Sequence, residues 1–215
     1  MKLLCVSDKI DPFIYTDSIR ENFADADMIL CAGDLQKDYL EFISGELNKP
    51  LLFVDGNDHT DFIIKNSYSG ISNIDNKVHK VKGLIIAGLG GCMRRQENPS
   101  RELCAKNEFT DFQMYLRIFK LLPTLFLNRL FHGRFVDILL THACPLGIHD
   151  KEDTYYLGFK SFLFFMKFFK PKYLVHGHVH LYDTSQARTT QYLDTLVINA
   201  YGYYVIDTGE KHNER

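Results

Sequence analysis

Short apolar runs alternate with amphipathic stretches in the first quarter of the chain. Residues 3–6, 28–31 and 51–54 are apolar runs with the length of buried strands. Residues 19–23 and 35–47 lie between them and carry apolar side chains at helical spacing. The order β-α-β-α-β predicts parallel strands that are joined by helical crossovers.

The remaining chain continues with the same kinds of pattern. Further strands are predicted at residues 78–81, 84–87, 136–140 and 173–175. Helices are predicted at 159–169 and at 109–131, where Pro123 is expected to break the second helix in two. Residues 195–199 and 203–206 predict a closing pair of strands around Gly202. Since no repeat, low-complexity segment or linker interrupts the pattern, residues 1–215 are predicted to form one domain.

Polar residues follow the predicted strands at their carboxyl ends. The first three strands run into Ser7-Asp8, Ala32-Gly33-Asp34 and Asp55-Gly56-Asn57-Asp58-His59. Two later strands run into Thr141-His142 and His176-Gly177-His178-Val179-His180. Open α/β sheets bind ligands at the carboxyl ends of their strands, so we expect these side chains to lie together.

Carboxylate, amide and imidazole groups form a set that suits divalent manganese, iron, zinc or nickel. Each group also has a structural interpretation, because aspartate and glycine are common in turns and a single histidine is often a hydrogen-bonded structural residue. The recurrence of such groups at five strand ends favours a site for one or two divalent ions. Two ions would position a phosphate and lower the pKa of a bridging water.

Composition and charge exclude several classes of protein. The 215 residues carry a formal net charge of -2 and no basic stripe interleaved with aromatics, so the sequence gives no strong nucleic-acid signal. No apolar stretch approaches the roughly 20 residues that span a bilayer, and the apolar run at the N-terminus is too short for a signal peptide. The five cysteines are scattered without paired spacing. We therefore expect no transmembrane segment, no disulfide framework and a cytoplasmic location.

The ordered set Asp8, Gly33-Asp34, Gly56-Asn57, Thr141-His142 and Gly177-His178-Val179-His180 resembles the calcineurin-like metallophosphoesterase family. The resemblance runs from Asp8 to about Asp207. It implies an α/β fold in four layers, in which a β-sandwich of two mixed sheets is flanked by helices.

The resemblance also implies roles for individual residues. Asp8 and His180 would hold the first metal, Asp34 would bridge both metals, and the second metal would be held by Asn57, His142 and His178. The run Gly88-Leu89-Gly90-Gly91 resembles a loop that the family places near its site. Gly91 and Arg94 or Arg95 are therefore candidate substrate contacts, with surface arginine as the alternative interpretation.

Two positions depart from the family pattern. Ile10 stands where the family usually has a histidine ligand of the first metal, and Asp11 is either a substitute ligand or a turn residue before Pro12. Asp58 stands where the family has its catalytic histidine, and His59 follows it. Asp58 and His59 are the candidate catalytic acids, although metal charge would lower the pKa of a carboxyl group and so oppose that role. The first metal site is expected to be weaker than the second.

These features predict a metal-dependent phosphoesterase that hydrolyses phosphomonoesters or phosphodiesters with a metal-bound hydroxide. The alternative is a weakened or inactive member of the fold that serves as a scaffold for protein partners. Residues Phe159 to Phe169 are nearly apolar all round, which indicates a helix packed between layers. Their other interpretation is a homodimer interface, a protein contact or a membrane-surface contact.

Overall fold

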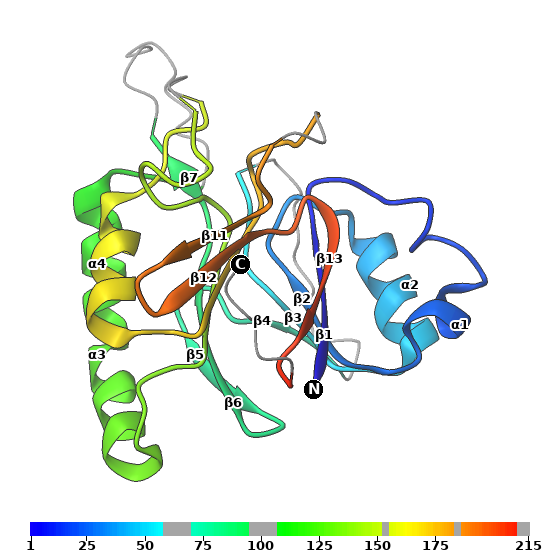
Figure 1. Ribbon diagram of the computed structural model, residues 1–215, viewed down its shortest axis with the longest axis horizontal. Coiled ribbons are helices and arrows are strands. Elements are labelled where there is room, and N and C mark those ends of the chain that lie inside the picture. The colour runs from blue at the N-terminus through cyan, green and yellow to red at the C-terminus, as the bar shows by residue number, and fades with distance from the viewer. Residues whose placement is uncertain (58–69, 95–106, 152–154, 183–185, 210–215) are drawn as a thin grey trace.

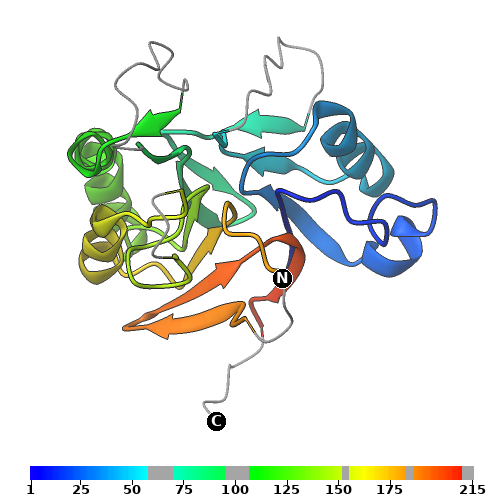
Figure 2. The same ribbon diagram turned by 90° about the horizontal axis from the view of Figure 1, so that it is seen from above.

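Two large mixed sheets pack face to face, and helices cover the outer side of each sheet (Figure 1). The computed structural model describes residues 1–57, 70–94, 107–151, 155–182 and 186–209. Seen from above, α3 and α4 (green and yellow) lie on one side of the sheets and α1 and α2 (blue) on the other (Figure 2). The predicted arrangement of two mixed sheets flanked by helices is confirmed.

The first sheet has the strand order β13-β1-β2-β3-β4. Its strands are β1 (Lys2–Ser7), β2 (Ala26–Cys31), β3 (Leu51–Phe53), β4 (Ile71–Asn73) and β13 (Gly202–Asp207). The strands β1 to β3 are parallel, as the β-α-β-α-β pattern predicts. Strand β4, which was not predicted, pairs parallel with β3, and β13 pairs antiparallel with β1. The helices α1 (Ile19–Phe23) and α2 (Lys37–Leu47) connect β1, β2 and β3.

The second sheet has the strand order β11-β12-β10-β9-β6-β5. Its strands are β5 (Val78–Val81), β6 (Leu84–Leu89), β9 (Ile138–Thr141), β10 (Tyr173–His176), β11 (Thr189–Tyr192) and β12 (Thr195–Asn199). The four central strands are parallel and the two edge strands are antiparallel. The helices α3 (Asp111–His132) and α4 (Lys160–Phe169) cover this sheet, and β7 (Cys92–Met93) pairs with β8 (Glu108–Phe109) beside it.

The apolar strands are buried on both faces, which explains their continuous apolar runs. In β1, Leu3 and Cys5 belong to the cluster between the two sheets, whereas Leu4 and Val6 pack with the residues under α1 and α2. A third cluster lies between the second sheet and the helices α3 and α4. Four layers of secondary structure therefore enclose three apolar layers.

Helix α3 is continuous, so the expected break at Pro123 is wrong. Pro123 lies on the exposed side of the helix, where water can hydrate the carbonyl that loses its partner. The buried residues Met114, Ile118, Leu121 and Leu125 continue at helical spacing past the proline. Packing of this buried side keeps the helix in one piece.

The expected pairing of the last two strands is also wrong. Strand β12 lies between β10 and β11 in the second sheet, and β13 pairs with β1 in the first sheet. The chain therefore crosses from one sheet to the other at residues 200–201, and Gly202 adopts a positive φ of 70° where β13 begins.

The interpretation of the phenylalanine-rich segment as a packed helix is confirmed. Phe162, Phe165 and Phe169 of α4 are buried in the cluster beneath the helix, together with Phe159 just before it. Phe168 is the large apolar side chain that α4 exposes most, at 49%. Within the described residues, no helix combines the length and the apolar character that a bilayer span requires.

Candidate metal centre

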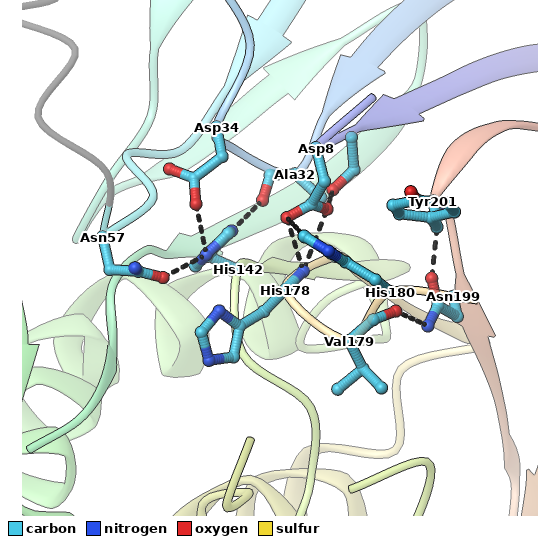
Figure 3. A network of polar contacts seen from close by, with 12 residues as sticks. Asp8, Ala32, Asp34, Asn57, His142, His178, Val179, His180, Asn199 and Tyr201 are labelled. Carbon is cyan, nitrogen blue, oxygen red and sulfur yellow. Dashed lines mark hydrogen bonds and ion pairs between the residues drawn. The ribbon is translucent and has the colours of Figure 1, made fainter. Parts of the chain in front are cut away.

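The polar residues at the strand ends meet at one end of the sandwich. Asp8, Asp34 and Asn57 follow β1, β2 and β3 of the first sheet, and His142 and His178 follow β9 and β10 of the second. Figure 3 shows that these side chains point toward one another from both sheets. The structure thus brings together side chains that are up to 170 residues apart in the sequence.

His142 lies in the middle of this group. Its Nδ1 is 2.8 Å from the carbonyl oxygen of Ala32, which is a hydrogen-bond acceptor, so Nδ1 carries a proton. Its Nε2 faces Asn57 Oδ1 at 2.8 Å and Asp34 Oδ2 at 3.1 Å. In the neutral ring Nε2 is itself an acceptor, so three acceptors converge on one point. Such a point requires either a proton on Nε2 or a cation, and a divalent ion fits this donor set.

His178 provides a second imidazole beside His142. Asp34, His142 and His178 each offer a ligand atom, and these atoms all lie within 4.8 Å of one another. The Nε2 atom of His178 is 2.8 Å from the carbonyl oxygen of Tyr155, which leaves Nδ1 with the free lone pair. Burial, with a smaller contribution from the charge of His142, lowers the pKa of His178 to about 4. His178 is therefore neutral at physiological pH, as a metal ligand must be.

Asp8 and His180 lie beside this group (Figure 3). The Asp8 carboxylate accepts hydrogen bonds from the backbone N–H of His178 at 3.0 and 2.9 Å and from the Ser7 hydroxyl. His180 Nε2 lies 3.8 Å from Asp8 Oδ1, and its Nδ1 lies 2.8 Å from the hydroxyl of Tyr182. Asp8 thus joins the end of β1 to the histidine loop after β10 (Figure 3).

Three of these residues have backbone conformations that are uncommon outside glycine. The φ angles of Asp8, Asp34 and His178 are 61°, 54° and 63°, in the left-handed region. Such conformations persist where surrounding contacts over-determine them, and they cluster at functional sites. Here each one turns the chain sharply at the end of a strand.

The predicted first metal position lacks one ligand of the family pattern. Ile10 packs against the apolar cluster under α1 and α2. The Asp11 carboxylate accepts a hydrogen bond of 2.9 Å from the backbone N–H of Phe13, which is a turn interaction. The described residues that remain for a first metal are Asp8, Asp34 and His180.

The structure gives less information on the other residues predicted for the site. Asp58, His59 and Arg95 lie outside the described residues. Gly91 donates its backbone N–H to the carbonyl of Asp55 at 2.8 Å, so the glycine-rich loop contacts the chain just before Asn57. The Arg94 guanidinium donates to the carbonyl of Glu108 at 3.3 Å. Contacts of Gly91 and Arg94 with a substrate stay predictions.

Several groups that support the centre had no signal in the sequence. They are backbone carbonyls, at Ala32 and Tyr155, and an amide side chain, at Asn107, which donates to the carbonyl of Gly56 at 2.9 Å. A backbone carbonyl is present at every residue, so only the fold identifies the ones that orient a ligand.

Metal binding is expected to depend on pH through His142. Burial opposes the charged form of His142, but the charges of Asp34 and Asp8 and the hydrogen bonds to Asp34 and to the Ala32 carbonyl together outweigh burial and raise the pKa to about 9. A metal must displace this proton, so we expect affinity for Mn²⁺ to increase about tenfold per pH unit from about pH 6 to pH 8. Calorimetry in buffers of different ionisation enthalpy should record about one proton released per ion. An affinity independent of pH would contradict this assignment.

Comparison with known proteins supports the fold. No protein-family model and no curated protein matches the sequence. One solved crystal structure shares 14% identity and a TM-score of 0.65, and the alignment covers 96% of this chain and 94% of that one. The protein TT1561 of Thermus thermophilus shares 15% identity over 93% of this chain and 88% of its own, with a TM-score of 0.59.

These two solved structures are metallophosphoesterase-fold proteins. The chain has the metallophosphoesterase fold. Vacuolar Protein Sorting 29 of Cryptosporidium parvum aligns over 93% of this chain and 72% of its own at 14% identity, and its TM-score of 0.44 is too low to add to this result. At these identities the likeness extends to the fold alone.

Proposed function

We propose that this protein is a metal-dependent hydrolase of phosphate esters. The observation that carries the proposal is the convergence of Asp34 Oδ2 and Asn57 Oδ1 on His142 Nε2, whose Nδ1 is committed to a backbone carbonyl. A proton on Nε2 satisfies these acceptors in the free site, and a divalent cation can replace it because a carboxylate oxygen, an amide oxygen and an imidazole nitrogen suit such an ion. The metallophosphoesterase fold supports placing the ion at the strand ends.

The residues divide between two neighbouring ion positions. Asn57, His142 and His178 would hold one ion, Asp8 and His180 the other, and Asp34 would contact both. Bound ions of this kind polarise a phosphoryl oxygen and lower the pKa of a bound water. The chain itself fixes the ligands before binding, because the Ala32 and Tyr155 carbonyls orient the two histidines.

Protonation of the leaving group is assigned to Asp58 or His59 as a hypothesis from the sequence. A metal nearby would keep a carboxyl group ionised, so His59 is the better candidate on chemical grounds. An aryl phosphodiester has a leaving group that is already a weak base. Loss of the acid should therefore reduce its hydrolysis less than that of an alkyl ester.

The proposal is tested by hydrolysis of bis-p-nitrophenyl phosphate. The protein is stripped of metal and assayed with added manganese, nickel or zinc. We expect metal-dependent turnover, and we expect Asn57→Ala to reduce it by at least about a hundredfold. Asn128→Ala is the matched control, because Asn128 lies on α3 and donates to the carbonyl of Phe135, which follows the helix. Asp58→Ala and His59→Ala, assayed alongside, identify the acid.

One observation favours a second function. Ile10 packs against the apolar cluster and has no ligand atom, so the first ion position would have fewer ligands than the second. The second candidate function is therefore a scaffold for protein partners that has this fold and binds one ion but no longer hydrolyses an ester. A folded protein that binds Mn²⁺ but hydrolyses no ester with any of the three metals would support the scaffold and contradict the hydrolase.

A further inference from the structure

Helix α3 exposes a continuous apolar surface on the outside of the molecule. Its large exposed side chains include Phe112, Leu116, Phe119, Phe126, Leu130 and Phe131, with exposed fractions from 44% to 75%. The first five recur at intervals of three, four or seven residues, which places them on one side of the helix. The opposite side of the helix is buried in the core.

Helix α4 extends the same surface. The ring of Phe168 lies 6.4 Å from that of Phe126, and the ring of Phe164 lies 5.6 Å from that of Tyr115. The exposed sides of α3 and α4 therefore adjoin, and we call them together the α3–α4 face. These helices form the outer layer of the molecule opposite α1 and α2 (Figure 1).

Most of the charged side chains around this face are positive. Residues 112–136 and 159–172 contain eight of the 25 lysines and arginines of the chain and none of its 27 aspartates and glutamates. Of these eight, Arg117 is buried against Asp75, and Arg134 and Lys170 pair with Asp137 and Asp194. Lys120 on α3 and Lys160 and Lys167 on α4 are exposed. Among the described residues, no carboxylate pairs with any of these three lysines. The rest of the chain holds 17 basic and 27 acidic residues, so the face differs in charge from the molecule as a whole.

The apolar side chains and the lysines together distinguish between a second copy of the protein and a membrane as the binding partner of this face. In a two-fold dimer through the face, the same lysines of both copies would approach one another and lose water without gaining a counter-ion. An anionic bilayer offers negative headgroups to the lysines and an acyl boundary to the phenylalanine and leucine side chains. We propose that the α3–α4 face docks the protein on an anionic phospholipid membrane. The contact lies in the interface and requires no spanning helix.

Sedimentation with phospholipid vesicles tests the docking. We expect the wild-type protein to bind phosphatidylcholine vesicles that contain phosphatidylglycerol, to ignore vesicles of phosphatidylcholine alone, and to dissociate at high salt. The triple variant Lys120→Glu, Lys160→Glu and Lys167→Glu should bind the anionic vesicles about a hundredfold or more weakly, since each cation near the surface contributes about fivefold or more. The variant Leu130→Ser and Phe131→Ser should also lose binding, through the apolar side.

The matched control reverses three cations on the other side of the molecule. Arg20→Glu, Lys37→Glu and Lys49→Glu make the same change in net charge beside α1 and α2, and this variant should bind anionic vesicles nearly as well as the wild type. If both triple variants lost vesicle binding equally, the loss would come from the change in net charge and not from this face, which would overturn the proposal. Absence of wild-type binding, or dimers in solution that the Leu130→Ser and Phe131→Ser variant disrupts, would also overturn it. The outcome is independent of the metal centre, because none of these residues belongs to it.

Discussion

Alanine in place of Gly177 is expected to abolish Mn²⁺ binding and to reduce metal-dependent hydrolysis by at least about a hundredfold. A Cβ at this position would overlap the Ser7 hydroxyl and the Asp8 carboxylate. Neither group can simply move aside, because Asp8 accepts hydrogen bonds from Ser7 and from the backbone N–H of His178. The added methyl group must therefore separate β1 from the histidine loop. As a result, the side chains of Asp8, His178 and His180 would no longer lie close together.

Calorimetry with Mn²⁺ and circular dichroism melting measure this effect and separate it from unfolding. Gly45→Ala in α2 is the control, since a Cβ at Gly45 meets no atom within 4 Å. That variant should bind Mn²⁺ normally and be more stable by up to about 1 kcal/mol, because alanine favours a helix. Wild-type affinity in Gly177→Ala would show that the Asp8 contact with the histidine loop does not support metal binding.

Arg117→Ala is expected to lower the free energy of unfolding by about 3 kcal/mol. Arg117 lies on the buried side of α3, where its guanidinium donates to the Gly90 carbonyl at 2.7 Å and to the Asp75 carboxylate at 2.6 Å. The Phe109 ring lies 4.3 Å from the guanidinium carbon. Removal of the arginine leaves a largely enclosed carboxylate and a carbonyl without this donor. The glycine-rich loop beside Asn57 would also lose its attachment to α3.

Urea denaturation measures this loss against a matched ion pair at the surface. Arg134 contacts Asp137 at 2.6 Å, and the Arg134 side chain is 46% exposed. Solvent screens this pair, so Arg134→Ala should cost about 1 kcal/mol or less. Similar losses in the two variants would contradict the buried role of Arg117.

The buried elements of the fold could be predicted because their apolar patterns are strong. The strands β1, β2 and β3 are covered on both faces, which gives continuous apolar runs, and the buried side of α2 gives clear helical spacing. The strand β4 has only partly buried residues and left no such pattern. The continuity of α3 was missed because the rule for proline describes the backbone and not the packing of the opposite side.

Strand pairing could not be predicted from neighbours in sequence. Residues 195–199 and 203–206 are close enough to suggest a hairpin, but β12 and β13 find their partners in different sheets. Those partners, β10 and β1, lie elsewhere along the chain. Pairing of this kind depends on the whole fold and not on the local pattern.

The candidate centre was partly visible in the sequence because its side chains belong to types that bind metals and follow strands. Parallel strand ends explain why Asp8, Asp34 and Asn57 meet. The left-handed backbone at Asp8, Asp34 and His178 was not predicted, because it depends on contacts that form only in the folded chain. The carbonyls that orient His142 and His178 were missed for the same reason.

Anomalous X-ray scattering from a crystal grown with Mn²⁺ tests the metal centre most directly. Data collected above the manganese absorption edge should give a strong peak among Asp34, Asn57, His142 and His178. A weaker peak should lie between Asp8, Asp34 and His180, because that position has fewer ligands. Absence of a peak among Asp34, Asn57, His142 and His178, or manganese bound only elsewhere, would contradict the assignment of these residues as a metal centre.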